Sequence, residues 1–266
     1  MKILKVYPSE DTPQRHNYRV NYGVWAKIKG DAVQMENFNV DPGNYDVIFL
    51  PQFKRWKNKT DLLSYIKNSR AKKVLFDNDS CYRSFDDPFY EGLDYIFYRD
   101  VDKNKETPGM KSSWLPWSVD TEYYTPVYGG EGIVFNCSVS KHYPLRTKIS
   151  ELVNNTRHQA DDYVMLLQQA AGAIHTDSPI VPVVRAKALE FAACGTHIIS
   201  NRTQKMEFFF PEDLVVYFDS VDELKNIINN FKPNMETQKK LREITVEMHD
   251  DKVRATQITN ILTGQI

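Results

Sequence analysis

The chain has 266 residues, which is enough for one large domain or two small ones. Hydrophobic residues make up 41% and charged residues 26%, as in ordinary soluble globular proteins, and this excludes a disordered or fibrous chain. The 34 Lys and Arg residues balance the 35 Asp and Glu residues, so the chain as a whole is not a polycation built to coat nucleic acid. No apolar run approaches the roughly 18 residues of a membrane span, so no membrane-spanning helix is predicted.

Short apolar runs alternate with helical patterns almost throughout the chain. The runs show little alternation of polar and apolar residues, which is typical of strands buried on both faces of a parallel sheet. The expected strands are Ile3–Tyr7, Asp46–Leu50, Lys73–Phe76, Asp94–Tyr98, Ser112–Leu115, Gly132–Asn136, Gly172–His175, His197–Ser200 and Leu214–Phe218. The expected helices are Tyr18–Ile28, Thr60–Asn68, Pro144–Val153, Asp161–Ala171, Val183–Cys194, Val221–Phe231 and a long polar helix from Met235 to about Leu262, broken near His249–Asp251.

This rhythm restarts after Tyr128-Gly129-Gly130, which predicts a domain boundary there. The expected architecture is therefore α/β, with an N-terminal Rossmann-like domain over residues 1–128 and a C-terminal one over residues 129–266. Ligands of such parallel sheets bind outside the carboxyl ends of the strands. Two such sheets that face each other would form a ligand-binding cleft between the domains.

The balanced total charge hides an asymmetry along the chain. Residues 1–75 carry 14 Lys and Arg against 7 Asp and Glu, a net charge of +7, whereas residues 76–125 carry 5 against 11, a net charge of −6. The basic block contains Gln52–Lys59, in which the side chains of Lys54, Arg55, Trp56, Lys57 and Lys59 interleave cations with an aromatic ring. Such a segment could bind the phosphates and bases of double-stranded DNA, or could be an ordinary solvated loop.

Several well-known motifs are absent. No GxGxxG follows the first strand and no GxxxxGK[ST] occurs, which disfavours a dinucleotide site and excludes a P-loop. Neither GxSxG nor HExxH is present. Asp77-Asn78-Asp79 has the DxD spelling that holds a metal–nucleotide in some sugar transferases, but acidic residues at strand ends are common, and no metal site is predicted.

Two segments carry more information than their hydrophobic pattern. The first, Ser113–Asp120, contains Leu-Pro-x-x-x-Asp, and the second is Arg185–Ser200. Together they resemble the two-domain GT-B glycosyltransferases of the family 4 type. The resemblance is greatest to the glycosyl transferases group 1 C-terminal domain of spore-maturation-like proteins, and it covers roughly residues 110–262.

The resemblance implies a GT-B fold, in which two Rossmann-like domains face a cleft, and an enzyme that transfers a sugar from a nucleoside-diphosphate sugar. The donor is expected to be a UDP-sugar, with no tightly bound cofactor. In that family an Arg-x-x-x-x-Glu-x-x-x-x-Gly helix presents its Glu to the nucleotide ribose, and Arg185, Glu190 and Gly195 stand in those places. The larger family has a second Glu eight residues before the first, where this chain has Pro182.

The charge of a nucleoside diphosphate requires cations at its binding site, and the sequence offers four such residues at the starts of two expected helices. A nucleoside diphosphate leaves with about two negative charges, which Arg, Lys and helix N-termini must stabilise when no metal does so. Arg146 and Lys148 fall in the first turn of an expected helix, where a cation opposes the helix dipole unless an anion binds. Arg185 and Lys187 stand in the same way at the start of another helix, so all four are candidate diphosphate ligands.

The remaining candidates follow strands. His175 ends a strand of the second domain and is a candidate nucleotide contact. His16 lies in a polar loop after the first strand, where an imidazole could take a proton from an acceptor hydroxyl. Asp77 and Asp79 end another strand of the first domain, so either could be the catalytic base of an inverting transfer. The alternative for each of these is an ordinary loop or strand-end residue.

The leading functional hypothesis is a glycosyltransferase that acts on a hydroxymethylated pyrimidine in phage DNA, because some phage GT-B enzymes modify DNA in this way and the first block is basic. A cell-envelope polysaccharide or a lipid-linked glycan is the alternative acceptor. A sugar-nucleotide epimerase and a non-catalytic nucleotide- or DNA-binding module are alternatives of other classes. Three isolated cysteines and the early acidic residues after Tyr7 favour the cytoplasm over secretion, which would be the host cytoplasm for a phage protein.

Overall fold

The structure is a computed structural model, and it describes residues 1–7, 22–51, 56–77, 88–99, 111–139, 143–155, 158, 160–176, 184, 186–202 and 205–265. The chain forms two compact units. Unit 1 consists of Met1–Pro116 together with Arg254–Ile266, and unit 2 is Trp117–Val253. Each is built on a parallel sheet, as the unbroken apolar runs predict.

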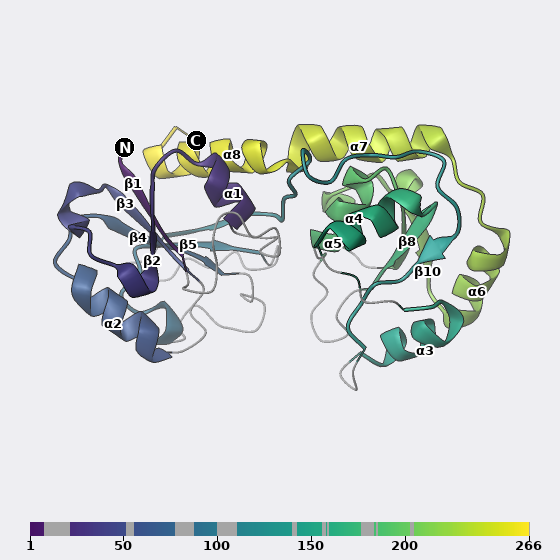
Figure 1. The fold of residues 1–266 in the computed structure, drawn as a ribbon, viewed down its shortest axis with the longest axis horizontal. Helices are drawn as coiled ribbons and strands as arrows, with labels where there is room; N and C mark the ends of the chain where they lie inside the picture. Colours follow the sequence, from purple (N-terminus) through teal and green to yellow (C-terminus); the bar gives the residue numbers. More distant parts are fainter. Residues whose placement is uncertain are drawn as a thin grey trace. The chain divides into compact units, whose positions relative to one another are not determined.

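Unit 1 contains a six-stranded parallel sheet in the order β2-β1-β3-β4-β5-β6. Its strands are β1 (Ile3–Tyr7), β2 (Asp31–Gln34), β3 (Val47–Leu50), β4 (Lys72–Asp77), β5 (Tyr95–Tyr98) and β6 (Lys111–Trp114). Its helices are α1 (Tyr22–Lys27), α2 (Trp56–Ile66) and α8 (Asp251–Thr263), the last of which starts in unit 2. Figure 1 shows α2 on one side of this sheet and α1 and α8 on the other.

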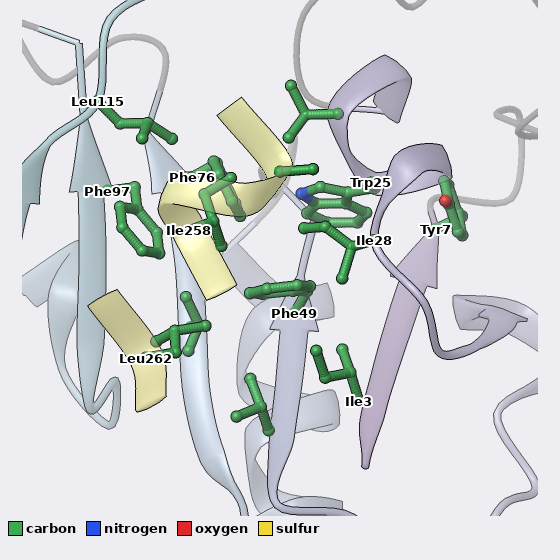
Figure 2. Close-up of a cluster of buried hydrophobic side chains, with 14 residues drawn as sticks. Ile3, Tyr7, Trp25, Ile28, Phe49, Phe76, Phe97, Leu115, Ile258 and Leu262 are labelled. Carbon is green, nitrogen blue, oxygen red and sulfur yellow. The ribbon is translucent and has the colours of Figure 1, made fainter. Parts of the chain in front are cut away.

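Alternate residues of the strands supply the two faces of this sheet. Leu4 and Val6 of β1 join the cluster that packs under α2, whereas Ile3 and Tyr7 join the cluster under α1 and α8. Aromatic rings fill the second cluster, where Trp25 stacks on Phe49 with ring centroids 5.7 Å apart. Figure 2 shows this cluster.

The C-terminal helix α8 completes the core of unit 1. Its residues Ala255, Ile258 and Leu262 form an apolar stripe that is buried in the cluster with Phe76 and Phe97 (Figure 2). The division of the chain therefore differs from the expected one, which placed residues 129–266 in one domain and put the boundary at residue 128. The sequence conceals this because the apolar stripe of α8 continues a polar helix without a change in composition.

A buried lysine supports the sheet from within. Lys5, in the middle of β1, is 6% exposed, and its Nζ donates hydrogen bonds to the carbonyl oxygens of Trp25 and Ile28, at 3.0 and 2.8 Å. Trp25 lies in the last turn of α1 and Ile28 directly follows the helix, and the Trp25 carbonyl also accepts a hydrogen bond from the Ile28 N–H at 3.2 Å. Burial lowers the pKa of Lys5, and the two carbonyls compensate for part of its lost hydration.

Unit 2 contains a four-stranded parallel sheet in the order β10-β9-β8-β7. The strands are β7 (Ile133–Val134), β8 (Gly172–His175), β9 (His197–Asn201) and β10 (Val216–Phe218), and the helices are α3 (Pro144–Leu152), α4 (Ala160–Gln169), α5 (Ala186–Ala193), α6 (Val221–Asn230) and α7 (Met235–His249). Ile149 of α3 and Leu224 of α6 are buried in one core cluster of this sheet. The helix α5 contacts β8 and β9, and α7 packs on α5 and β9.

The junction of α7 and α8 is tied to the segment that enters unit 2. Val119 forms a parallel bridge with Asp250; the Val119 N–H donates to the His249 carbonyl, and the Asp251 N–H donates to the Val119 carbonyl, both at 3.0 Å. Asp250 also accepts a hydrogen bond from the hydroxyl of Thr121 at 2.5 Å. The predicted break near His249–Asp251 is thus present and is fixed by these bonds.

The largest local difference from the predicted elements is β2, which the hydrophobic pattern missed. Asp31-Ala32-Val33-Gln34 has no apolar run because it is an edge strand, with two exposed and two half-buried residues. The helix α2 begins at Trp56, four residues before the expected Thr60. The strand β7 is only two residues long, since the chain leaves the sheet at Phe135.

A shorter side chain at a core position of α8 should destabilise unit 1. Ile258 is fully buried in the aromatic cluster, so Ile258→Ala should lower the free energy of unfolding by about 2–5 kcal/mol. The matched control is Val253→Ala on the same helix, where the side chain is 37% exposed and the expected decrease is under about 0.5 kcal/mol. Urea unfolding followed by circular dichroism measures both. Equal decreases would contradict the packing of α8 into this core.

A buried histidine should make unit 2 sensitive to acid. His197 is 3% exposed; its Nε2 accepts a hydrogen bond from the Asn234 N–H at 2.8 Å, and its Nδ1 has no partner among the described residues. Burial lowers the pKa of His197 in the folded protein, so the unfolded chain binds more protons and stability falls as the pH drops below about 6.5.

The variant His197→Gln keeps a hydrogen-bond acceptor and removes the titrating group. It should therefore flatten the decline in melting temperature between about pH 7.5 and pH 5.5. Calorimetry at several pH values measures this slope. An unchanged slope in the variant would assign the acid sensitivity to other groups.

Candidate functional site

The carboxyl ends of β7 and β8 and the start of α5 bring several predicted residues of unit 2 together. We call the side chains of Arg146, Thr176, Lys187, Tyr163 and Glu190 the strand-end cluster. Arg146 and Lys187 both contact the segment Asn136–Ser138, which follows β7, and Glu190 lies one turn after Lys187 on α5. The cluster occupies the edge at which parallel sheets bind their ligands.

Arg146 is held by neutral oxygen atoms. Its Nε donates to the Thr176 hydroxyl at 2.8 Å, and its terminal nitrogens donate to the carbonyl oxygens of Ser138 and Thr176, each at 3.4 Å. The guanidinium also lies 3.9 Å from the ring centroid of Tyr143. Within the described part of the chain Arg146 has no carboxylate partner. The half-buried guanidinium is thereby fixed in orientation, and no carboxylate of the described residues neutralises its charge.

Lys187 places a second cation on the same segment after β7. Its Nζ donates to the carbonyl oxygen of Asn136, lies 3.9 Å from the sulfur of Cys137 and lies 5.6 Å from the ring centroid of Tyr163. The helix position of Lys187 is the second residue of α5, where a cation opposes the helix dipole. A bound anion would reverse that unfavourable interaction.

Glu190 provides the acidic group of the cluster. The side chain is 2% exposed, and its Oε2 accepts a hydrogen bond from the Tyr163 hydroxyl at 2.9 Å. Its Oε1 accepts no hydrogen bond from the described residues. Four residues further along the chain, burial raises the pKa of Cys194 to about 12, and the charge of Glu190 acts in the same direction, so this thiol stays protonated.

The segment under the two cations is itself braced. The side-chain amide of Asn155 pairs with the main chain of Cys137, accepting from its N–H at 3.2 Å and donating to its carbonyl at 3.0 Å. Asn136 donates from Nδ2 to the carbonyl of His158 at 3.1 Å. These bonds fix the carbonyl oxygens of the segment to which Lys187 and Arg146 bind.

The other predicted residues of unit 2 stand outside this arrangement or beyond the described residues. His175 is 2% exposed and its Nδ1 lies 3.0 Å from the Ser200 hydroxyl, so the ring is buried between β8 and β9. Lys148 is exposed on α3 and makes no hydrogen bond or ion pair with residues the structure describes. Arg185 lies outside the described residues.

Unit 1 holds one described candidate for the acceptor side. Asp77 ends β4, is fully buried, and accepts a hydrogen bond at Oδ2 from the Tyr90 hydroxyl at 2.5 Å. His16 and Asp79 lie outside the described residues. The roles of these three residues stay predictions.

The structure corrects one residue of the predicted DNA-binding segment. Lys59 is 2% exposed, its Nζ donates to the Pro88 carbonyl at 3.2 Å, and it lies 5.7 Å from the ring centroid of Phe89. It is therefore a buried lysine whose Nζ is directed at the main chain of Pro88. Lys54 and Arg55 lie outside the described residues, and the side chains of Trp56 and Lys57 are not described.

Sequence reasoning missed Tyr163 and Tyr143, which contact Glu190 and Arg146. Neither residue belongs to a recognisable motif, and only the folded chain brings them to the cluster. In the described part of the chain, no three His, Cys, Asp or Glu side chains gather as metal ligands would. Over the same residues, no helix has the length and apolar character needed to cross a bilayer.

Two parallel-sheet α/β units, with six and four strands, have the architecture of a GT-B fold. The sequence profile of the glycosyl transferase-like family matches residues 119–260, more than half of the chain, and the chain belongs to that family. No match was found among curated protein sequences.

Solved structures support the fold. The chain is similar to Anabaena HepE in complex with UDP and glucose, with 12% identity, a TM-score of 0.67, and 99% of this chain and 100% of that chain covered. It is similar to the DNA modifying enzyme β-glucosyltransferase, with 8% identity, a TM-score of 0.67, and 98% and 99% covered. A T4 phage enzyme in complex with its UDP-glucose substrate gives 10% identity, a TM-score of 0.64, and 98% and 99% covered.

Proposed function

We propose that the protein transfers a sugar from a UDP-sugar to an acceptor hydroxyl, and that the strand-end cluster binds the donor. The observation that carries this proposal is Arg146, a half-buried guanidinium without a carboxylate partner among the described residues, fixed at the ends of two parallel strands. UDP is the proposed nucleotide because similar structures were solved with UDP or UDP-glucose. Arg146 and Lys187 are the proposed source of charge stabilisation for the leaving diphosphate.

The proposed roles follow from the chemistry of each group. Arg146 and Lys187 bind the diphosphate and stabilise the charge that develops on it as the bond between the sugar C1 and the phosphate oxygen breaks. Glu190 accepts a hydrogen bond from a ribose hydroxyl at Oε1, since its Oε2 is occupied by Tyr163. The acceptor oxygen forms the new bond to C1, and its proton passes to a base, for which Asp77, Asp79 and His16 are the proposed candidates.

For the acceptor we propose a hydroxymethylated pyrimidine in duplex DNA. Two observations support this choice: the net charge of +7 over residues 1–75, and the similarity to a DNA modifying enzyme over nearly the whole chain. HepE has the same TM-score, so the basic charge of residues 1–75 is the observation that favours DNA over another acceptor.

Loss of the Arg146 charge should impair donor use. Because a hydrogen bond to a charged group contributes about 1.5–3 kcal/mol, Arg146→Gln should lower kcat/KM for UDP-sugar hydrolysis by about 10- to 100-fold. The matched control is Lys225→Gln, which removes an exposed cation from α6 and should change the rate less than about twofold. Equal effects in the two variants would remove Arg146 from the donor site. A wild-type protein that neither binds UDP nor hydrolyses any UDP-sugar would refute the proposed function.

The proposed acceptor makes a separate prediction. Replacement of Lys54, Arg55 and Lys57 by Gln should weaken duplex binding and reduce the slope of log affinity against log salt by about 0.9 for each DNA phosphate that is no longer neutralised. Lys59 is left intact because it is buried. The control replaces three exposed lysines of unit 2, Lys225, Lys232 and Lys239. Transfer of labelled sugar to DNA that contains hydroxymethylcytosine completes the test; no transfer to DNA, with transfer to a polysaccharide, would contradict this acceptor.

A further inference from the structure

The hydrogen bond between Tyr163 and Glu190 links the helices α4 and α5 inside unit 2. Tyr163 lies on α4, is fully buried, and donates from its hydroxyl to Glu190 Oε2 at 2.9 Å. Glu190 lies on α5 and is 2% exposed. A buried carboxylate usually has both oxygen atoms satisfied, yet Oε1 of Glu190 receives no bond from the described residues.

In this arrangement Oε2 of Glu190 already accepts a hydrogen bond, and Oε1 is available to accept one from a ligand. An ionised carboxylate can only accept hydrogen bonds, and a phenolic hydroxyl can donate one. With Oε2 bound to Tyr163, rotation of the carboxylate would break an existing bond. The orientation of Oε1 is therefore set before any ligand arrives, which lowers the entropic cost of binding a donor group.

We propose that Tyr163 is a positioning residue that fixes Glu190 so that Oε1 selects a ribonucleotide donor through one ribose hydroxyl. The inference rests on the proposed function, in which Glu190 binds the ribose. It adds that discrimination between ribose and deoxyribose depends on the Tyr163 hydroxyl. A site built to bind a hydroxyl rejects the analogue that lacks it, because its own polar group is then left without a partner.

The phenylalanine variant isolates this hydroxyl. Tyr163→Phe keeps the ring that lies 5.6 Å from Lys187 Nζ and that contacts Tyr124 edge-on, so the packing and the second cation are preserved. Without the phenolic bond, Glu190 can rotate and Oε2 can compete for the ligand. The affinity for UDP should fall by about three- to tenfold, while the affinity for the deoxy analogue changes little.

The experiment is calorimetric titration of the full chain with UDP, 2′-deoxy-UDP and 3′-deoxy-UDP. The wild-type protein should prefer UDP over at least one analogue by about tenfold or more, and Tyr163→Phe should reduce that preference to about threefold or less. The matched control is Tyr217→Phe, which removes a hydroxyl from β10 at the opposite edge of the sheet from β7 and should keep the wild-type preference. Melting temperatures of all variants verify folding.

A double-mutant cycle distinguishes positioning from general destabilisation. Glu190→Gln should also reduce the preference for UDP, and addition of Tyr163→Phe to Glu190→Gln should reduce it no further, because the two residues act as one unit. A structural role for Tyr163 would lower the affinity for all three ligands equally.

The possible outcomes separate this inference from the function on which it rests. If Tyr163→Phe retains the wild-type preference, the positioning role is wrong and the proposed function stands. If the wild-type protein binds UDP and both deoxy analogues equally, ribose selection by Glu190 and its positioning by Tyr163 are both wrong. If the wild-type protein binds none of the three, the proposed function itself fails.

Discussion

The structure depends most on one positive charge, Arg146, which among the described residues is held by neutral oxygen atoms and an aromatic ring. The guanidinium of Arg146 donates hydrogen bonds to a hydroxyl and to main-chain carbonyls, which fix its position. Because these acceptors carry no net charge, they do not neutralise its positive charge. A carboxylate partner would have neutralised that potential and turned the residue into a structural ion pair. Because the charge stays uncompensated within the described chain, an anion is the ligand that we propose for this edge of the sheet.

The parallel sheet of unit 2 makes this arrangement possible. All of its strands end at one edge, so the segments after β7 and β8 and the start of α5 converge there although they are far apart in the sequence. Bonds such as that of Asn155 to the main chain of Cys137 fix the carbonyl oxygens that receive the cations. The main-chain carbonyl oxygens are thus fixed first, and they orient the side chains of Arg146 and Lys187.

Much of the fold followed from the sequence because buried parallel strands are continuous apolar runs. The predicted GT-B fold is confirmed by two parallel sheets. The pattern could not reveal β2, a polar edge strand, or the return of α8 to unit 1, since long-range packing leaves no local periodic signal. Motif and helix position singled out Arg146, Lys187 and Glu190, whose side chains lie at one edge of the sheet of unit 2 and whose roles in donor binding stay proposals. The contact of Tyr163 with Glu190 was not predicted, because a tyrosine on an amphipathic helix is usually a core residue. The burial of Lys59 was not predicted either, because a lysine in a basic segment is usually exposed.

The most direct test of the central claim compares the affinities of UDP, UMP and uridine for the wild-type protein at constant salt. If the two cations form a diphosphate site, affinity should rise by about tenfold or more from uridine to UDP, with most of the gain from the phosphates. Equal affinities for the three ligands would show that the charge of Arg146 is not directed at phosphate, and would contradict the account.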